Sequence, residues 1–211
     1  MDWSVVWDYR QFLAEGLWLT VQLSLGGIIG STLLGVAVGC LGTLPSYFAR
    51  RLISSYVSLL RNLPLILKLF FLHFVLGVNA YASGLIALTL HQSAYIADLT
   101  TSGLRSIPSG QTEAALALGH SRRGALWYVI APQVIRTIIP ALITQYVGVI
   151  KNSAVAMLLS LQELTFMTQK IEHETLRGFE AVAAATILYL SLMLIVTGGM
   201  TALHRTLRRP S

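Results

Sequence analysis

Polar residues that could do chemistry are few in this chain, and they fall into two groups. The first group stands inside long apolar stretches and comprises Lys68, His91, Gln92, Asp98, Gln145, Lys151 and Asn152. Such a side chain costs about 2.5–3.5 kcal/mol at the centre of a membrane helix, so it usually lines a cavity or pairs with a partner. The second group surrounds Glu113. The first pattern indicates contact with a polar solute, and the second indicates a protein contact.

Enzyme and metal chemistry find no support in the sequence. The five histidines lack the spacing of metal ligands. No Ser-His-Asp pattern stands in a plausible context, and no G-x-x-x-x-G-K-[ST] phosphate loop occurs. We therefore expect no catalytic residue, no metal site and no cofactor on this chain.

Composition predicts that the chain lies in a membrane. Of its 211 residues, 55% are hydrophobic and 11% are charged, and the mean hydropathy is +0.67. Soluble domains average about 25% charged residues. A soluble fold of this composition would need an impossibly large core, whereas a bilayer is itself an apolar solvent.

Long uncharged runs predict an all-α integral membrane protein with a single domain over residues 1–211. Residues 16–49, 69–97 and 181–204 carry no charge, and a helix needs about 20 apolar residues to cross the hydrocarbon core. Splitting the runs at turn residues gives about five spans. These spans are expected near residues 17–42, 55–77, 81–103, 136–158 and 180–203.

The positions of the charges predict the orientation. With the N-terminus outside, the external segments hold three basic residues and the cytoplasmic segments hold nine. This bias follows the positive-inside rule and favours an N-out, C-in chain. The nine are Arg50, Arg51, Arg105, Arg122, Arg123, Arg136, Arg205, Arg208 and Arg209. The net charge of +6 therefore reports topology, and we expect no nucleic-acid partner.

Two periodic patterns predict how helices pack. Gly27, Ser31, Gly35 and Gly39 recur every four residues, which lets helix backbones approach closely. We expect this stripe to pack within one fold and not to form a dimer motif. Apolar residues at helical spacing over 161–171 predict a short amphipathic helix at the outer surface. It could be a connector, or an external gate or docking surface.

Residues 105–133 form an unusually long cytoplasmic segment with the pattern of two helices joined at a glycine. Ser109 can cap a helix that stops at Gly119. Ser121 can cap a second helix, which we expect to end before Pro132. The alanines of the first helix leave a narrow surface that could enter a groove on another protein. Its Glu113 is the only acidic residue expected on the cytoplasmic side.

This segment resembles the Glu-Ala-Ala signature of ABC importer permeases. The residues are Glu113-Ala114-Ala115, then Gly119, then Val129-Ile130-Ala131-Pro132, where the family usually ends in Ile-x-Leu-Pro. In that family the segment is the coupling helix, which docks into a cleft of a separate ATPase subunit. By this resemblance, the contact residues are Glu113, Ala114, Ala115, Leu118 and Gly119.

The resemblance extends along nearly the whole chain to permeases for polar amino acids. Residues 16–21, 56–71, 93–98 and 151–154 are similar to segments of that subfamily. It implies the type I ABC importer fold, a bacterial inner membrane location and transport of glutamate, aspartate, glutamine or a basic amino acid. The short external connection near Gly77 departs from the subfamily.

A transported amino acid carries a carboxylate and an ammonium group, and both need partners once desolvated. We expect a substrate pathway lined by Gln92, Ser93, Gln145, Asn152 and Lys151. The amides and hydroxyl could equally bond one helix to another, and that alternative stays open. Lys151, like Asp98, could also be a structural or gating charge.

The resemblance also implies partners. Because the chain lacks a phosphate loop, ATP and Mg²⁺ are expected on two ATP-binding subunits. Five spans enclose too little volume for a pore, so we expect a second permease subunit, identical or homologous. An external solute-binding protein should deliver substrate, and membrane lipid should surround the complex.

The alternative function is an ion-gradient-driven secondary transporter or channel subunit. Such proteins often carry inverted internal repeats and broken helices. The two halves of this chain show no repeat, and a long alanine-rich cytoplasmic segment has no role in such a protein. The sequence therefore favours the ATP-driven importer.

Overall fold

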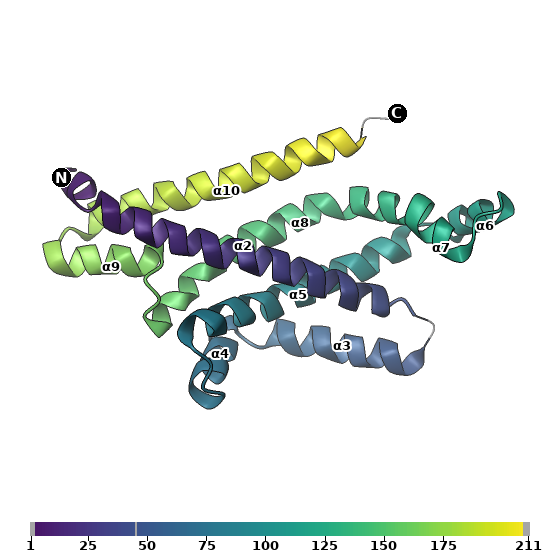
Figure 1. Ribbon diagram of the computed structural model, residues 1–211, viewed down its shortest axis with the longest axis horizontal. Helices are drawn as coiled ribbons and strands as arrows, with labels where there is room; N and C mark the ends of the chain where they lie inside the picture. Colours follow the sequence, from purple (N-terminus) through teal and green to yellow (C-terminus); the bar gives the residue numbers. More distant parts are fainter. Residues whose placement is uncertain (1–2, 45, 209–211) are drawn as a thin grey trace.

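The computed structural model describes residues 3–44 and 46–208, and these form helices without any strand. Long helices lie side by side along one axis of an elongated bundle (Figure 1). Arg209, one of the nine basic residues behind the predicted orientation, lies outside the described residues. The helices are α1 (Ser4–Asp8), α2 (Arg10–Leu41), α3 (Tyr47–Asn62), α4 (Leu65–Phe70), η1 (Phe71–Val75), α5 (Ala80–Ser106), α6 (Ser109–Ala117), α7 (Arg122–Gly124), η2 (Ala125–Ile130), α8 (Ala131–Ser153), η3 (Ala154–Leu159), α9 (Leu164–Thr175) and α10 (Gly178–Arg208).

The small-residue stripe of α2 lies against α5. A Cβ atom added at Gly35 would come within 2.7 Å of the Ile96 Cβ, and one added at Gly39 within 2.6 Å of the Thr100 Cβ. Thr101 on α5 donates a hydrogen bond of 3.0 Å to the Gly39 carbonyl oxygen. The expected packing within one fold is therefore confirmed.

A sharp bend interrupts the second predicted span. Helices α3 and α4/η1 meet at an angle of 100°, because Leu63 is extended ahead of Pro64, where helical backbone is disfavoured. The Lys68 ammonium group reaches back across the bend and donates to the Leu60 carbonyl oxygen at 2.6 Å. The bend therefore satisfies a carbonyl that the end of α3 leaves free.

Helix α5 lies inside the bundle, in contact with α2, α3, α4 and α8. By length and apolarity, three helical segments could cross a membrane, namely Arg10–Leu41, Arg122–Leu159 and Gly178–Leu207. The bent pair α3 and α4/η1 qualifies as a fourth. The predicted count of five would add α5. This helix can be more polar because its neighbours, and not lipid, surround most of it.

The helix that begins at Arg122 continues without a break to Leu159. The expectation that it ends before Pro132 is wrong. Residues Ala125–Ile130 form a π-helical stretch, and Pro132 follows in the first turn of α8. The wider π turn makes room for the proline ring and absorbs its missing N–H group, so the helix need not stop.

The predicted amphipathic helix is α9. It packs into the end of the bundle and does not lie on the surface as a simple connector would. Leu164, Met167 and Ile171 are buried. The Leu164 N–H group donates 3.0 Å to the hydroxyl oxygen of Thr20 on α2. Helix α9 also contacts α10, so it joins the first and last long helices.

Candidate functional site: a projecting helical hairpin and an interior polar path

The predicted coupling segment projects beyond the end of the bundle as α6, a glycine turn and α7 with η2 (Figure 1). Gly119 has a φ of +87°, which a residue with a side chain rarely adopts. The N–H group of His120 donates 3.1 Å to the Ala115 carbonyl oxygen and so closes the turn. Ser121 caps the second helix as predicted, by accepting from the Gly124 N–H group at 3.1 Å.

Ser109 does not cap α6, contrary to the expectation. It is the first residue of the helix, and the cap position is Pro108, which makes no side-chain cap bond. Proline fixes φ near the helical value, so the preceding Pro108 orients the chain for the helix without a side-chain acceptor.

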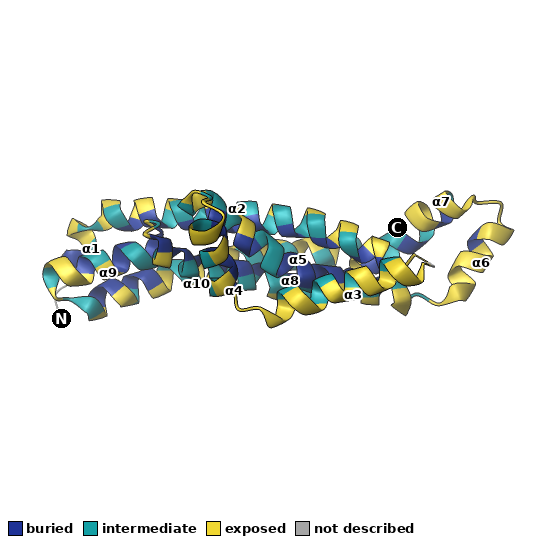
Figure 2. Cartoon of the chain, turned by 90° about the horizontal axis from the view of Figure 1, so that it is seen from below, coloured by how far each residue is buried: buried dark blue, intermediate teal, exposed yellow. Residues whose placement is uncertain are grey.

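Most of the hairpin surface is open (Figure 2). Glu113 and Ala114 are exposed, and Leu118 is 83% exposed. Ala115, by contrast, is 3% exposed and faces η2 of the same chain. Of the five predicted contact residues, Ala115 therefore holds the hairpin together, while the other four lie on its free surface. Sequence reasoning missed Trp127 and Tyr128, which are 69% and 77% exposed on η2.

The interior amides predicted to line a pathway form a direct pair. The Gln92 side-chain amide on α5 donates 2.5 Å to the amide oxygen of Gln145 on α8. Ser93 turns toward α3, where its hydroxyl lies 2.7 Å from the Tyr56 hydroxyl. The structure therefore brings two of the predicted residues together and sends the third to another neighbour.

Lys151 and Asn152, adjacent on α8, line different spaces. Lys151 is exposed and lines a hollow with Tyr189 of α10. Asn152 faces a small space beside Leu69 of α4 and Ala87 of α5. Adjacent residues of a helix point about 100° apart, so one predicted pathway set maps onto two faces of α8.

Two further polar contacts join α5 to the second span. The Lys68 ammonium group lies 2.8 Å from the His91 Nδ1 atom. The Arg61 guanidinium group donates 2.6 Å to the Asp98 carboxylate. The Arg61 Cζ atom also lies 4.9 Å from the centroid of the Tyr95 ring. Arg61 lies within the predicted span 55–77 but was not among the residues predicted to line the pathway.

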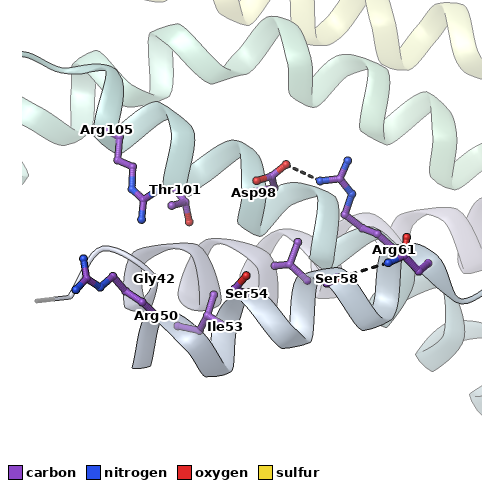
Figure 3. A pocket seen from close by; sticks show the side chains of 11 residues that line it. Gly42, Arg50, Ile53, Ser54, Ser58, Arg61, Asp98, Thr101 and Arg105 are labelled. Atoms are coloured by element: carbon purple, nitrogen blue, oxygen red, sulfur yellow. Dashed lines mark hydrogen bonds and ion pairs between the residues drawn. The ribbon is translucent and has the colours of Figure 1, made fainter. Parts of the chain in front are cut away.

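A cavity of about 400 Å³ opens between α3 and α5. We call it the α3–α5 cavity. The Arg61–Asp98 pair forms one part of its wall, and Arg50 and Arg105 line the part nearer the loops (Figure 3). Its lining residues are Gly42, Arg50, Ile53, Ser54, Val57, Ser58, Arg61, Asn62, Asp98, Thr101 and Arg105.

The opposite end of the bundle holds a buried acid that the sequence did not single out. Glu163 is fully buried and caps α9 by accepting from the Phe166 and Thr165 N–H groups, each at 2.9 Å. The Tyr189 hydroxyl donates to it at 2.8 Å. Burial raises the pKa of the Glu163 carboxyl, although the hydrogen bonds act in the opposite direction.

Across the described ranges, no three His, Cys, Asp or Glu side chains gather as metal ligands would. The family of the chain follows from comparison with known proteins. The model of the family described as "Binding-protein-dependent transport system inner membrane component" matches residues 31–209. The chain belongs to this family. The predicted integral membrane class, transport role and inner membrane location are thereby confirmed.

Individual relatives of this inner membrane component align over almost the full chain. The glutamine transport system permease protein GlnP of Escherichia coli (strain K12) is 28% identical, covering 98% of each chain. The probable glutamine ABC transporter permease protein GlnM of Bacillus subtilis (strain 168) is 29% identical over 99% of each. The glutamate/aspartate import permease protein GltJ of Escherichia coli (strain K12) is 27% identical, covering 96% of this chain and 89% of that protein.

Solved structures agree with this assignment. A chain from the crystal structure of an amino acid ABC transporter with histidines superposes with a TM-score of 0.87 and 26% identity, covering 98% of this chain and 99% of that one. A chain of the MetNI methionine ABC transporter in an inward-facing conformation reaches 0.82 at 18% identity, covering 96% and 99%, which shows a shared fold. The predicted ABC importer permease fold is confirmed.

Proposed function

We propose that this inner membrane component is the permease subunit of an ABC importer for polar amino acids. The relatives named for glutamine and for glutamate and aspartate support this substrate class. ATP and Mg²⁺ belong to two separate ATP-binding subunits. A second permease subunit, identical or homologous, completes the path, and an external solute-binding protein delivers the amino acid.

The observation that carries this proposal is the projecting hairpin and its continuity with α8. The hairpin leaves Glu113 and Leu118 free for a partner. From Arg122 a single helical segment runs to Leu159 and carries Gln145, which bonds Gln92 on α5. A displacement of the hairpin by an ATPase would therefore pass along one continuous helical segment to the interior amides.

The pathway lies along α5 and α8, and the chain is oriented N-out, C-in. The end of α5, the start of α8 and the end of α10 lie at the same end of the bundle as the hairpin (Figure 1). Basic residues concentrate in these segments, as the positive-inside rule requires of a cytoplasmic end. The hairpin then faces the compartment that holds ATP.

The test is reconstitution of this chain with its ATPase and binding protein in proteoliposomes. Binding protein loaded with glutamine or glutamate should raise the ATPase rate, and Glu113→Lys should abolish the increase while the chain still inserts in the membrane. An ATPase rate that ignores the loaded binding protein in the wild-type complex would refute the proposal. Arg205→Gln, on the exposed end of α10, serves as the matched charge-change control.

A further inference from the structure

The α3–α5 cavity carries an excess of positive charge. Among its lining residues, three are arginines and one, Asp98, is acidic. Asp98 already accepts from Arg61 at 2.6 Å. Among the described side chains, Arg50 and Arg105 find no acidic partner within salt-bridge distance. Two guanidinium groups therefore have no carboxylate partner, whereas the one carboxylate of the lining already pairs with Arg61, so the net charge of the lining is positive.

The Arg61–Asp98 pair lies deep along the helices. Asp98 precedes the end of α5 at Ser106 by eight residues, which is about 12 Å of helix. The Arg61 and Asp98 side chains are nevertheless 40% and 53% exposed within this chain. Charged groups at that depth do not face hydrocarbon. This face of α3 and α5 therefore borders a watery cavity or another subunit, and not lipid.

The rest of the lining suits a small polar solute. Hydroxyl and amide groups surround the arginines, from Ser54, Ser58, Asn62 and Thr101, and only Ile53 and Val57 contribute aliphatic side chains. Along α3, Arg50 and Arg61 are eleven residues apart, or about 16 Å. The cavity thus runs from near the loops toward the bend, and its volume falls within the range of small-molecule sites.

We propose that the α3–α5 cavity receives the carboxylate of the transported amino acid, and that the permease accordingly carries neutral and acidic amino acids and rejects cationic ones. This inference rests on the proposed import of polar amino acids and narrows it. A carboxylate matches the planar fork of an arginine side chain. An arginine or lysine substrate would instead meet two unpaired arginines, and the single acid of the lining already pairs with Arg61.

A lipid phosphate is the other anion that arginines bind, and the cavity suits it less well. A bound phospholipid also needs an apolar slot for its acyl chains, which this mostly polar lining does not provide.

The direct test measures binding without the solute-binding protein, so that its selectivity does not enter. The wild-type permease–ATPase complex is placed in nanodiscs, and its affinities for glutamine, glutamate, arginine and lysine are compared. Glutamate and glutamine should bind at least about tenfold more tightly than arginine and lysine, the difference expected for one charge-assisted contact. Equal or tighter binding of arginine overturns the inference.

Variants of the cavity arginines test whether glutamate binds in the α3–α5 cavity. Replacing both free arginines, as Arg50→Gln with Arg105→Gln, should lower glutamate affinity by about tenfold and should narrow the gap to arginine. Arg51→Gln is the matched control, because Arg51 neighbours Arg50 on α3, lies outside the cavity lining and bonds Tyr47 instead. If the double variant and the control lose affinity equally, the cavity is not the site.

Varying the lipid composition distinguishes a lipid phosphate from an amino acid carboxylate as the anion that the cavity binds. Nanodiscs of phosphatidylcholine alone are compared with nanodiscs containing phosphatidylglycerol. The proposal predicts that the effect of the double variant on glutamate binding is the same in both. An effect that appears only with phosphatidylglycerol would assign the cavity to lipid phosphate and contradict the proposal. Absence of ATP-driven import by the complete wild-type complex would instead refute the proposed function itself.

Discussion

The Gln92 amide on α5 donates to the Gln145 amide oxygen on α8 across 2.5 Å, and this contact joins α5 to the helix that leads to the hairpin. Gln92 is 4% exposed, so its side chain bonds to another protein group and not to solvent. An interior hydrogen bond between two helices fixes their relative position and leaves other amide positions free for a solute.

Replacing Gln92 by alanine should therefore change substrate affinity and selectivity while association with the ATPase is retained. The substitution leaves the Gln145 amide without its partner, which costs about 1–3 kcal/mol for a buried polar group. Transport assays with several amino acids would give the change in KM for each. Unchanged uptake of all of them would reduce the contact to helix packing.

Gly119 should be intolerant of substitution. Its φ of +87° is barred to proline, whose ring fixes φ near −65°, so Gly119→Pro should abolish transport while the protein still inserts. Gly110 in α6 has no atom within 4 Å of an added Cβ and no positive φ, so Gly110→Ala is the control. Normal transport by Gly119→Pro, measured as uptake in proteoliposomes, would show that the turn is not needed for coupling.

The close contact between α2 and α5 should be sensitive to an added side chain. A Cβ at Gly35 would meet both the Ile96 side chain and the Ser93 carbonyl oxygen at 2.7–2.8 Å. Overpacking of this kind costs about 1–3 kcal/mol, so Gly35→Ala should lower the Tm of the purified protein. Gly198→Ala on α10 meets no atom within 4 Å and should not lower the Tm, because alanine favours a helix over glycine. Equal Tm values for both variants would contradict the close packing.

The buried Glu163, at the end of the bundle opposite the hairpin, predicts a pH dependence of stability. Because burial raises its pKa in the folded protein, its protonated form contributes stability that is fully present below the ordinary glutamate pKa. That contribution is lost as the pH rises through the folded-state pKa. The Tm of the wild type, relative to Glu163→Gln, should therefore fall as the pH rises above 4.5, the ordinary value. Parallel pH profiles for the two proteins would show that Glu163 does not titrate in this way.

Much of the fold could be predicted because a membrane restricts the choices. Uncharged runs of sufficient length predict helices, and the four-residue spacing from Gly27 to Gly39 predicts the face that packs. The motif from Glu113 to Gly119 located the hairpin. These features depend on local sequence, and each is visible in a single stretch of the chain.

Features set by contacts between distant residues could not be predicted. The burial of Glu163 depends on Tyr189 of α10, 26 residues away. The Arg61–Asp98 pair requires the 100° bend that places the end of α3 beside α5. Pro132 suggested a helix end because the local rule against proline is strong, but the preceding π turn relieves the clash.

In the proposed function, ATP hydrolysis on a partner, and not an ion gradient, drives an amino acid through this chain. The most direct measurement is accumulation of labelled glutamine in proteoliposomes that contain the complete complex, with ATP enclosed and ionophores added to collapse ion gradients. Accumulation that persists with ionophores and requires ATP is the predicted result. Accumulation that continues without ATP and stops with ionophores would contradict the account and indicate a secondary transporter.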